Sequence, residues 1–265
     1  MSVRVTGGGG VRRGVTIGCL VLLMIPFVLV GYFWFTFWHA GRENERREQA
    51  AFEALLRRAH DAADRTADAL TRSRDTGADA LMGVIWEHTG SPVISHDEER
   101  RAFTAVADRS TLVEQEPVPL VSGPVMVQRC FTYTYVRRPD AEWTWRVTER
   151  DREACRASGE IGDSVFFARV RMRAMEVGSL TRAGLQRVLE PDGRPFEERR
   201  FVVRRVDRAG QTVVALVLAR YVDRYGTSGD EPGVVEQCYR FTRAVDSDGG
   251  VEGRVTAAPV AAAGC

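Results

Sequence analysis

Residues 124–148 read PVMVQRCFTYTYVRRPDAEWTWRVT, and residues 232–256 read PGVVEQCYRFTRAVDSDGGVEGRVT. The two segments align without a gap at an offset of 108 residues. They share a Pro, a Val, a Cys, a Thr and the closing triplet Arg-Val-Thr, and one aromatic residue replaces another at two further positions. Self-similarity at a fixed offset is typical of a supersecondary unit that is used twice. The pattern therefore predicts an internal duplication, against the alternative of a chance match.

Each copy of this repeat has the pattern of a β-hairpin. In the first copy, Val125 to Val136 is rich in β-branched and aromatic residues, Arg138-Pro139-Asp140 favours a turn, and Trp143 to Thr148 fits a second strand. The elements expected in the second copy are a strand at 234–244, a turn at 246–250 and a strand at 251–256.

Four cysteines accompany the two hairpins: Cys130, Cys155, Cys238 and Cys265. Four cysteines allow three pairings. Each copy holds one cysteine in its first strand and is followed by another, so the duplication selects Cys130–Cys155 and Cys238–Cys265. The alternatives are free buried thiols and a zinc site, but the short Cys-x-x-Cys or His spacings of zinc sites are missing. Because disulfides persist in oxidising compartments, this pairing predicts that residues 76–265 form an extracytoplasmic domain.

A second region, Val15 to Trp38, reads VTIGCLVLLMIPFVLVGYFWFTFW and carries no charge. About 20 apolar residues suffice for a helix to cross the hydrocarbon core of a bilayer, so this run predicts a transmembrane helix at 15–38. Its aromatic C-terminal third suits the membrane interface. A cleaved signal peptide is the alternative, but it would have a shorter apolar core and a small-residue cleavage site. Cys19 lies near the start of the run, where a lipidated cysteine would not be expected.

The orientation of this helix follows from its flanking charges only in part. Arginines precede the run without any acidic residue, and further arginines mixed with glutamates follow it. Arginine counting alone gives a near tie under the positive-inside rule. The predicted disulfides resolve the tie. We therefore expect a single-pass signal-anchor protein of the cell membrane, with a basic cytoplasmic tail at residues 1–14 and the C-terminal domain outside.

Between the membrane and the domain, residues 39–75 have the pattern of a juxtamembrane helix. One apolar stripe recurs at steps of three and four residues and consists of Phe52, Leu55, Leu56, Ala59, Ala63, Thr66 and Leu70. The stripe either packs on the domain's own sheet or pairs with another copy of the chain through the helix at 42–73. The second reading would make the protein a homo-oligomer.

The rest of the chain predicts an α+β domain of helices and mostly antiparallel strands. Residues 76–158 and 159–265 are also candidates for two similar halves. The further elements expected are a helix at 75–90, a helix at 97–108 begun by Ser95 or His96, a connector at 114–123, a strand or buried helix at 163–175, a helix at 179–189 begun by Ser179, and a hairpin with strands at 201–206 and 212–221.

Composition and motifs exclude several classes of function. The net charge is +1, and the part beyond the apolar run is slightly acidic, which argues against a nucleic-acid partner. All basic residues are Arg, which fits a GC-rich genome. The acidic residues near His60 and His96 fit solvated helix surfaces, and no serine elbow or phosphate-binding loop is present. We therefore predict no catalytic, cofactor-binding or metal-binding residues and no cofactor.

The most concentrated aromatic cluster lies in the first hairpin and consists of Phe131, Tyr133, Tyr135, Trp143 and Trp145. Packing in the core is the favoured interpretation, and a groove for a peptide or glycan is the alternative. The protein resembles uncharacterised membrane proteins of GC-rich bacteria in general type, because its basic residues are all Arg, it is rich in Ala and it is predicted to cross the membrane once. This resemblance implies no activity and no functional residues.

The functional hypothesis that follows is a non-enzymatic, membrane-anchored extracytoplasmic domain that binds a protein or another envelope component. Two alternatives remain. One is a structural or assembly component of a membrane complex in the cell envelope, and the other is an envelope enzyme without a recognisable motif.

Overall fold

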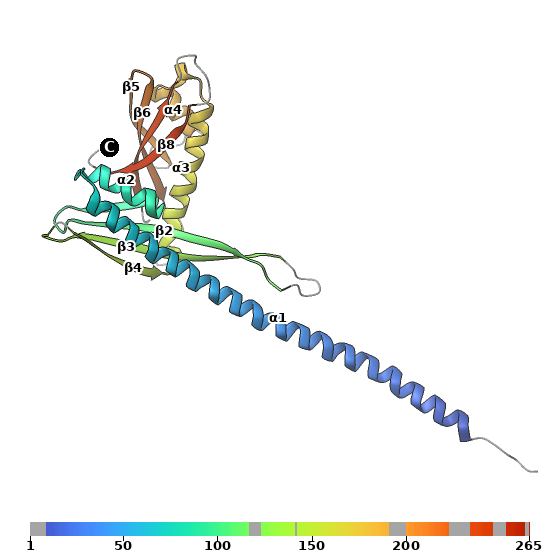
Figure 1. The fold of residues 1–265 in the computed structure, drawn as a ribbon. Helices are drawn as coiled ribbons and strands as arrows, with labels where there is room; N and C mark the ends of the chain where they lie inside the picture. The colour runs from blue at the N-terminus through green and yellow to red at the C-terminus, as the bar shows by residue number, and fades with distance from the viewer. Residues whose placement is uncertain are drawn as a thin grey trace, which may run out of the picture. The chain divides into compact units, whose positions relative to one another are not determined.

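The computed structural model is an α+β fold that combines a long N-terminal helix with two four-stranded antiparallel sheets (Figure 1). It describes residues 9–116, 123–140, 142–190, 200–222, 234–245, 253–262 and 265, with side chains from residue 24 onward. The chain forms two compact units. The N-terminal unit comprises Met1–Phe52 and Thr111–Val127, and the sheet unit comprises Glu53–Ser110 and Gln128–Cys265.

The elements follow one another in an order that repeats. A helix, a shorter helix and a four-stranded sheet occur in sequence, and the same order then occurs again. The bounds are α1 Gly9–Arg72, α2 Ala78–Thr89, β1 Val93–Asp97, β2 Ala102–Val113, β3 Val125–Arg137, β4 Trp143–Arg150, the 3-10 turn η1 Arg152–Cys155, α3 Arg156–Ala174, η2 Val177–Ser179, α4 Arg182–Leu189, β5 Phe201–Ala209, β6 Thr212–Val222, β7 Val234–Ala244 and β8 Val255–Val260. The strands lie in the orders β1-β2-β3-β4 and β5-β6-β7-β8.

Helix α1 is continuous for 64 residues and contains Pro26. It includes the helix predicted at 39–75 up to Arg72 and continues from it directly into the apolar run. Among the described residues, α1 is the one helix that is long and apolar enough to cross a membrane. Its apolar side chains between Met24 and Trp38 are exposed, and Trp34 exposes 75% of its surface. A core helix of the same composition would bury these side chains.

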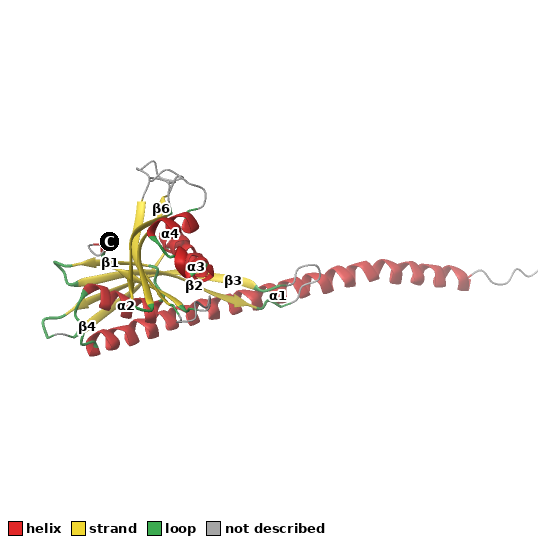
Figure 2. Ribbon diagram, turned by 90° about the horizontal axis from the view of Figure 1, so that it is seen from above, coloured by secondary structure: helices red, strands yellow, loops and turns green. Residues whose placement is uncertain are grey.

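Within the sheet unit, the part of α1 that begins at Glu53 packs on the first sheet (Figures 1 and 2). The ring of His60 lies 5.6 Å from that of Trp145 on β4, and the Trp145 indole donates a hydrogen bond to Asp64. The side chains that α1 buries are Leu55, Ala59, Ala62, Ala63, Thr66, Ala67 and Leu70. The predicted apolar stripe therefore packs within its own chain. Leu56, which the periodicity assigned to the stripe, is 38% exposed.

The second sheet carries a continuous hydrophobic core. Helices α3 and α4 lie on one face of it (Figures 1 and 2). The buried set from the two helices is Ile161, Val165, Ala168, Met172, Leu185 and Leu189, and the facing strands contribute Phe201, Val203, Val213, Ala215, Val217, Ala219, Tyr239, Phe241 and Val255. The segment predicted as a strand or buried helix at 163–175 thus belongs to a helix. The short helix α4 begins at a Thr181 cap rather than at Ser179, because the Thr181 hydroxyl accepts a hydrogen bond from the Gly184 amide.

The two sheets are joined inside the sheet unit. The buried Gln237 side chain on β7 accepts a hydrogen bond from the Ile94 amide on β1 at 2.9 Å and donates one to the Val260 carbonyl at 3.0 Å. The Tyr239 hydroxyl donates to the Pro92 carbonyl. An amide side chain in a core is stable only when its polar atoms are paired in this way.

The repeat seen in the sequence occupies the same place in both sheets, namely the third and fourth strands. Cys130 lies opposite Arg150 in the first sheet, whereas Cys238 lies opposite Val260 in the second. The second connection is therefore two residues longer than an ungapped alignment allows. Consequently the two Arg-Val-Thr triplets, which support the duplication in the sequence, are not equivalent in register. A shift of two residues leaves every side chain on its original face of the sheet, and the strand expected at 251–256 is found at Val255–Val260.

The helix predicted at 97–108 is wrong, because most of this segment is strand β2. Phe103, Ala105 and Ala107 are buried at a period of two, and β1 pairs antiparallel with β2. The acidic run before it forms the turn, where Asp97 accepts a hydrogen bond from the Arg100 amide at 3.0 Å. Alanine favours a helix in isolation, but burial against neighbouring strands overrides such a small preference.

The hairpin expected at 201–221 is confirmed by β5 and β6, whose turn contains Gly210 with a φ of 57°. The helix expected at 75–90 is confirmed by α2. The predicted turn at 246–250, most of the connector at 114–123 and the N-terminal tail at 1–8 lie outside the described residues.

Candidate interaction surfaces

Both cysteine pairs are disulfide-bonded in the pattern that the repeat predicts. Cys130 is bonded to Cys155 and Cys238 to Cys265. Cys130, Cys155 and Cys238 are buried. Each bond ties the third strand of a sheet to the chain just beyond the fourth, so each closes the hairpin that contains it. The cysteines therefore have a structural role.

The predicted aromatic cluster is mostly buried in the core. Phe131, Tyr133 and Tyr135 occupy every second position of β3 and so point to one face of the sheet; they are at most 1% exposed, and Trp143 is 9% exposed. Burial raises the pKa of the Tyr135 hydroxyl well above its usual value. Of the five aromatic residues, Trp145 alone is partly exposed, and its ring lies 5.6 Å from that of His60 at an interplanar angle of 58°.

A polar cavity of about 400 Å³ lies beside the first disulfide. Its lining residues are Asp108, Gln128, Arg152, Glu153, Cys155, Arg156, Gly159, Glu160 and Asp163. Gln128 donates a hydrogen bond to Asp108, and Glu153 pairs with Arg156 at 3.7 Å. The other two acidic residues of the lining, Glu160 and Asp163, are exposed on α3.

The histidines and carboxylates are also candidates for a metal site. Within the described residues, no three of the His, Cys, Asp and Glu side chains converge on a position that could hold a metal ion. His96, considered above as a helix start, instead stacks on Phe103 with ring centroids 4.4 Å apart. The prediction that the chain has no cofactor stays a prediction.

The outer face of α3 exposes a group of large apolar side chains, which is the most concentrated one among the described residues of the sheet unit. Phe166 and Phe167 are 58% and 59% exposed, and Val170 is 53% exposed. The two phenyl rings pack edge to face with centroids 5.6 Å apart. Because residues three and four apart lie on one side of a helix, Phe166 and Val170 belong to one stripe, and Phe167 adjoins it. We call these three residues the α3 apolar face.

Charged residues flank this face in two groups of opposite sign. Glu160 and Asp163 are exposed on the N-terminal side, and Arg171 and Arg173 are exposed on the C-terminal side. Arg171 also donates to the carbonyls of Val188 and Leu189 at the end of α4. The exposed side of α3 therefore runs from negative through apolar to positive along the chain.

A buried arginine fixes the C-terminal end of α3. Arg243 on β7 is completely buried, and its Nη1 donates to the Met172 and Met175 carbonyls, both at 2.7 Å. Burial lowers the pKa of this guanidinium. The carbonyls at a helix end carry partial negative charge, and the arginine pairs with two of them, although the Met172 carbonyl also accepts a hydrogen bond from the Met175 amide at 3.3 Å.

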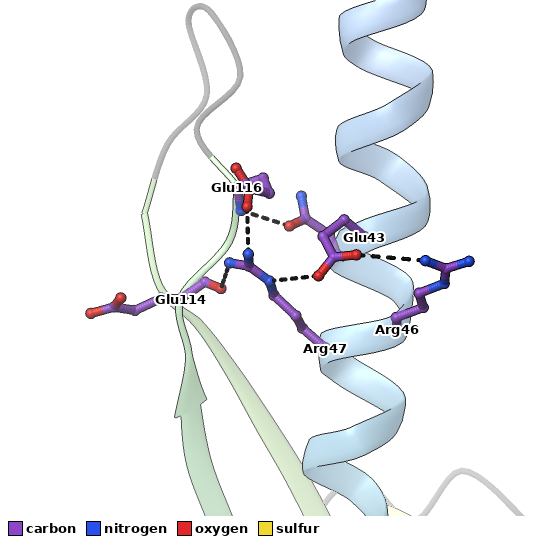
Figure 3. Close-up of polar contacts among 6 residues, drawn as sticks. Glu43, Arg46, Arg47, Glu114 and Glu116 are labelled. Atoms are coloured by element: carbon purple, nitrogen blue, oxygen red, sulfur yellow. Dashed lines mark hydrogen bonds and ion pairs between the residues drawn. The ribbon is translucent and has the colours of Figure 1, made fainter.

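The N-terminal unit contains a second polar cluster, in which the connector after β2 is bound to α1 (Figure 3). Arg47 on α1 donates from Nη1 to the Glu114 carbonyl at 3.1 Å, and it also pairs with Glu116 and with Glu43 on its own helix. Asn44 accepts a hydrogen bond from the Glu116 amide at 2.7 Å. We call this arrangement the juxtamembrane clamp, because it begins only a few residues after the apolar run.

Sequence reasoning misses the α3 apolar face and the clamp for different reasons. Residues 161–172 carry apolar side chains on both sides of α3, so the sequence does not reveal which side the core covers. The clamp joins side chains from distant parts of the chain, and no local pattern marks such a contact. A helix that is apolar all round is itself a signal, since both of its faces need to be buried.

No protein-family model matches the chain, and no curated protein sequence matches it. Among solved structures, one described as an "Ntf2 like protein involved in plasmid conjugation" aligns with 68% of this chain and 86% of its own length. The sequence identity is 12% and the TM-score is 0.16. A likeness at this level carries no argument about the fold or the function of this chain.

Proposed function

We propose that the chain is a membrane-anchored protein whose sheet unit lies outside the cytoplasm and binds another protein through the α3 apolar face. The observation that carries this proposal is the exposure of Phe166, Phe167 and Val170 on a helix whose opposite side is part of the core. Contiguous exposed apolar side chains with a polar surround are typical of protein-interaction sites, and aromatic residues are enriched there.

The anchoring part of the proposal rests on the N-terminal end of α1. Its exposed apolar side chains need an apolar environment, which a bilayer provides over the length of about 20 helical residues. At the end of this run, the Arg42 guanidinium lies 4.1 Å from the centre of the Trp38 ring. Such pairs of Trp and Arg suit the membrane interface, where a ring and a charge are both well solvated.

The extracytoplasmic location is supported by the two disulfides. Bonds of this kind form and persist in oxidising compartments and are rare in the cytoplasm. The catalytic alternative has less support, because in the cavity beside Cys155 the side chain of Asp108 is bonded to Gln128 and that of Glu153 is paired with Arg156. A role in assembling an envelope complex would use the same apolar face.

The proposal is tested by site-specific photo-crosslinking of the full-length chain in its native cells. A photoreactive phenylalanine analogue replaces Phe167, and in a matched control it replaces Arg208, which is exposed on β5. We expect a covalent protein adduct of discrete mass from position 167 and none from position 208. Equal behaviour at the two positions, with or without adducts, would contradict the assignment of α3 as the binding surface.

A further inference from the structure

We infer that the protein bound by the α3 apolar face is a second copy of this chain, with the two α3 helices packed antiparallel about a two-fold axis. This inference rests on the proposed function, since it names the partner of the same face. A two-fold interface is formed by one surface patch that is complementary to itself. The outer face of α3 has this property in both its shape and its charge.

The centre of the face supplies the apolar contact. A two-fold axis near Phe167 places the phenyl rings of the two copies next to each other, with Val170 of each copy beside them. Phe166 and Phe167 already pack edge to face, so burying their rings at an interface costs little further conformational entropy. Buried aromatic residues contribute much of the binding energy of protein interfaces. Covering these three side chains would remove from water the most exposed large apolar side chains among the described residues of the sheet unit.

The charges at the two ends determine the direction of the pairing. In an antiparallel pair, Glu160 and Asp163 of one copy face the half of the other helix that carries Arg171 and Arg173. In a parallel pair, like charges would face one another, and like-charge contacts across an interface are costly. At the N-terminal end, Arg156 is engaged by Glu153, so the acidic character of that end remains.

The interface expected between the two copies is small. A contact through one helix per copy falls in the class of weak interfaces that bury less than about 1,200 Å². Anchoring of both copies in one membrane would compensate for this small area, because tethering raises the effective concentration of one copy near the other. The self-association should therefore be stronger in the membrane than for the same chain diluted in micelles.

A charge-reversal experiment tests the inference on the full-length chain reconstituted in phosphatidylcholine vesicles. Self-association is measured by energy transfer between donor-labelled and acceptor-labelled copies. Two block variants are compared, Glu160→Arg with Asp163→Arg, and Arg171→Glu with Arg173→Glu. Each alone should weaken association about ten-fold, and the chain that carries all four substitutions should recover it to within about three-fold, because the complementarity is then restored. Asp61→Arg with Arg208→Glu, both on other exposed surfaces, is the matched control and should change nothing.

The outcomes separate this inference from the proposed function. Recovery in the four-fold variant supports the antiparallel homodimer, because a different partner protein would not carry the compensating charges. Association that is insensitive to the block variants overturns the α3 interface. Absence of self-association together with a crosslinked protein of different mass at position 167 overturns the homodimer and leaves the proposed function standing. Absence of both overturns both. Loss of Arg171 could loosen α4, so Phe167→Asp, which leaves the α4 contacts intact, provides an independent variant that should also weaken association.

Discussion

At the scale of single residues, the most unusual feature is the guanidinium of Arg243, which is buried on β7 of the second sheet. A buried charge is costly unless its donors are used. Here Nη1 donates to two helix-terminal carbonyls, whereas Nε and Nη2 are buried with no hydrogen-bond partner among the described residues. The arginine therefore connects β7 to the end of the helix that presents the α3 apolar face. The position of that face depends on a contact from the opposite side of the helix.

Replacement of this arginine gives a quantitative test. Arg243→Ala removes two charge-assisted hydrogen bonds and leaves a cavity, so we expect the free energy of unfolding to fall by about 3 kcal/mol. Arg243→Met keeps most of the side-chain volume and removes the buried charge, so its loss should be clearly smaller. Urea denaturation followed by circular dichroism measures both. Equal losses in the two variants would show that the side-chain volume at this position does not contribute to stability, which would contradict the prediction.

The buried tyrosines predict how stability depends on pH. Burial raises the pKa of Tyr135 and of Tyr239 far above the value of about 10 that tyrosine has in an unfolded chain. The unfolded state therefore loses these protons first as the pH rises. The stability conferred by the neutral hydroxyls is complete below pH 10 and falls above it, by about 1.4 kcal/mol per pH unit for each tyrosine.

Urea denaturation between pH 8 and pH 11 measures this dependence. The variant with both Tyr135→Phe and Tyr239→Phe should lose stability less steeply above pH 10 than the natural chain. Tyr239→Phe also removes the hydrogen bond to the Pro92 carbonyl, so the double variant should be less stable than the natural chain already at pH 8. The test therefore compares how steeply the stability of each protein falls with pH. Parallel slopes in the two proteins would contradict the account.

At the scale of elements, the juxtamembrane clamp is a local contact with its own test. Asn44→Ala combined with Arg47→Ala removes the acceptor of the Glu116 amide and the donor to the Glu114 carbonyl. We expect faster hydrogen exchange in the segment around Glu114 to Glu116, measured by mass spectrometry on the full chain. Arg46→Ala is the matched control, because Arg46 makes one weak ion pair with Glu43 at 3.8 Å and is largely exposed. Equal exchange in both variants would mean that the clamp does not hold the connector.

The elements also show what a single sequence can predict. The hairpin strands, their cysteine pairing and α2 follow from local periodicity and from the repeat, because these signals are contained in short segments. The segment at 102–113 does not follow, since its alanines favour a helix locally and become a strand only through pairing with β1 and β3. The orientation of α3 is hidden for a related reason, namely that it depends on which side of the helix the second sheet covers.

The candidate interaction surfaces were less predictable than the fold. The absence of a catalytic motif directs attention to binding, but the three residues of the α3 apolar face look like core residues in the sequence. The aromatic cluster of the first hairpin shows the converse, since Tyr133 and Tyr135 are conspicuous in the sequence and are buried in the structure. Exposure is a property of tertiary packing, and residue type alone does not determine it.

At the scale of the whole molecule, the chain consists of an apolar helix followed by one structural theme used twice. Each copy has two helices, four antiparallel strands and a disulfide behind the last hairpin. The first copy draws its leading helix from the end of α1, so the apolar helix and the first half share one continuous element. In the second copy, the first helix is α3, which is separate from α1 and presents the α3 apolar face.

This account depends on the compartment in which the sheet unit, which contains both disulfides, is located. The measurement that tests it most directly is a disulfide map by peptide mass spectrometry, with free thiols blocked in intact cells before lysis. We predict peptides that join Cys130 to Cys155 and Cys238 to Cys265, which would support an oxidising, extracytoplasmic location for the proposed binding domain. Recovery of all four cysteines as blocked free thiols would place them in the cytoplasm and contradict both the proposed orientation and an extracytoplasmic partner.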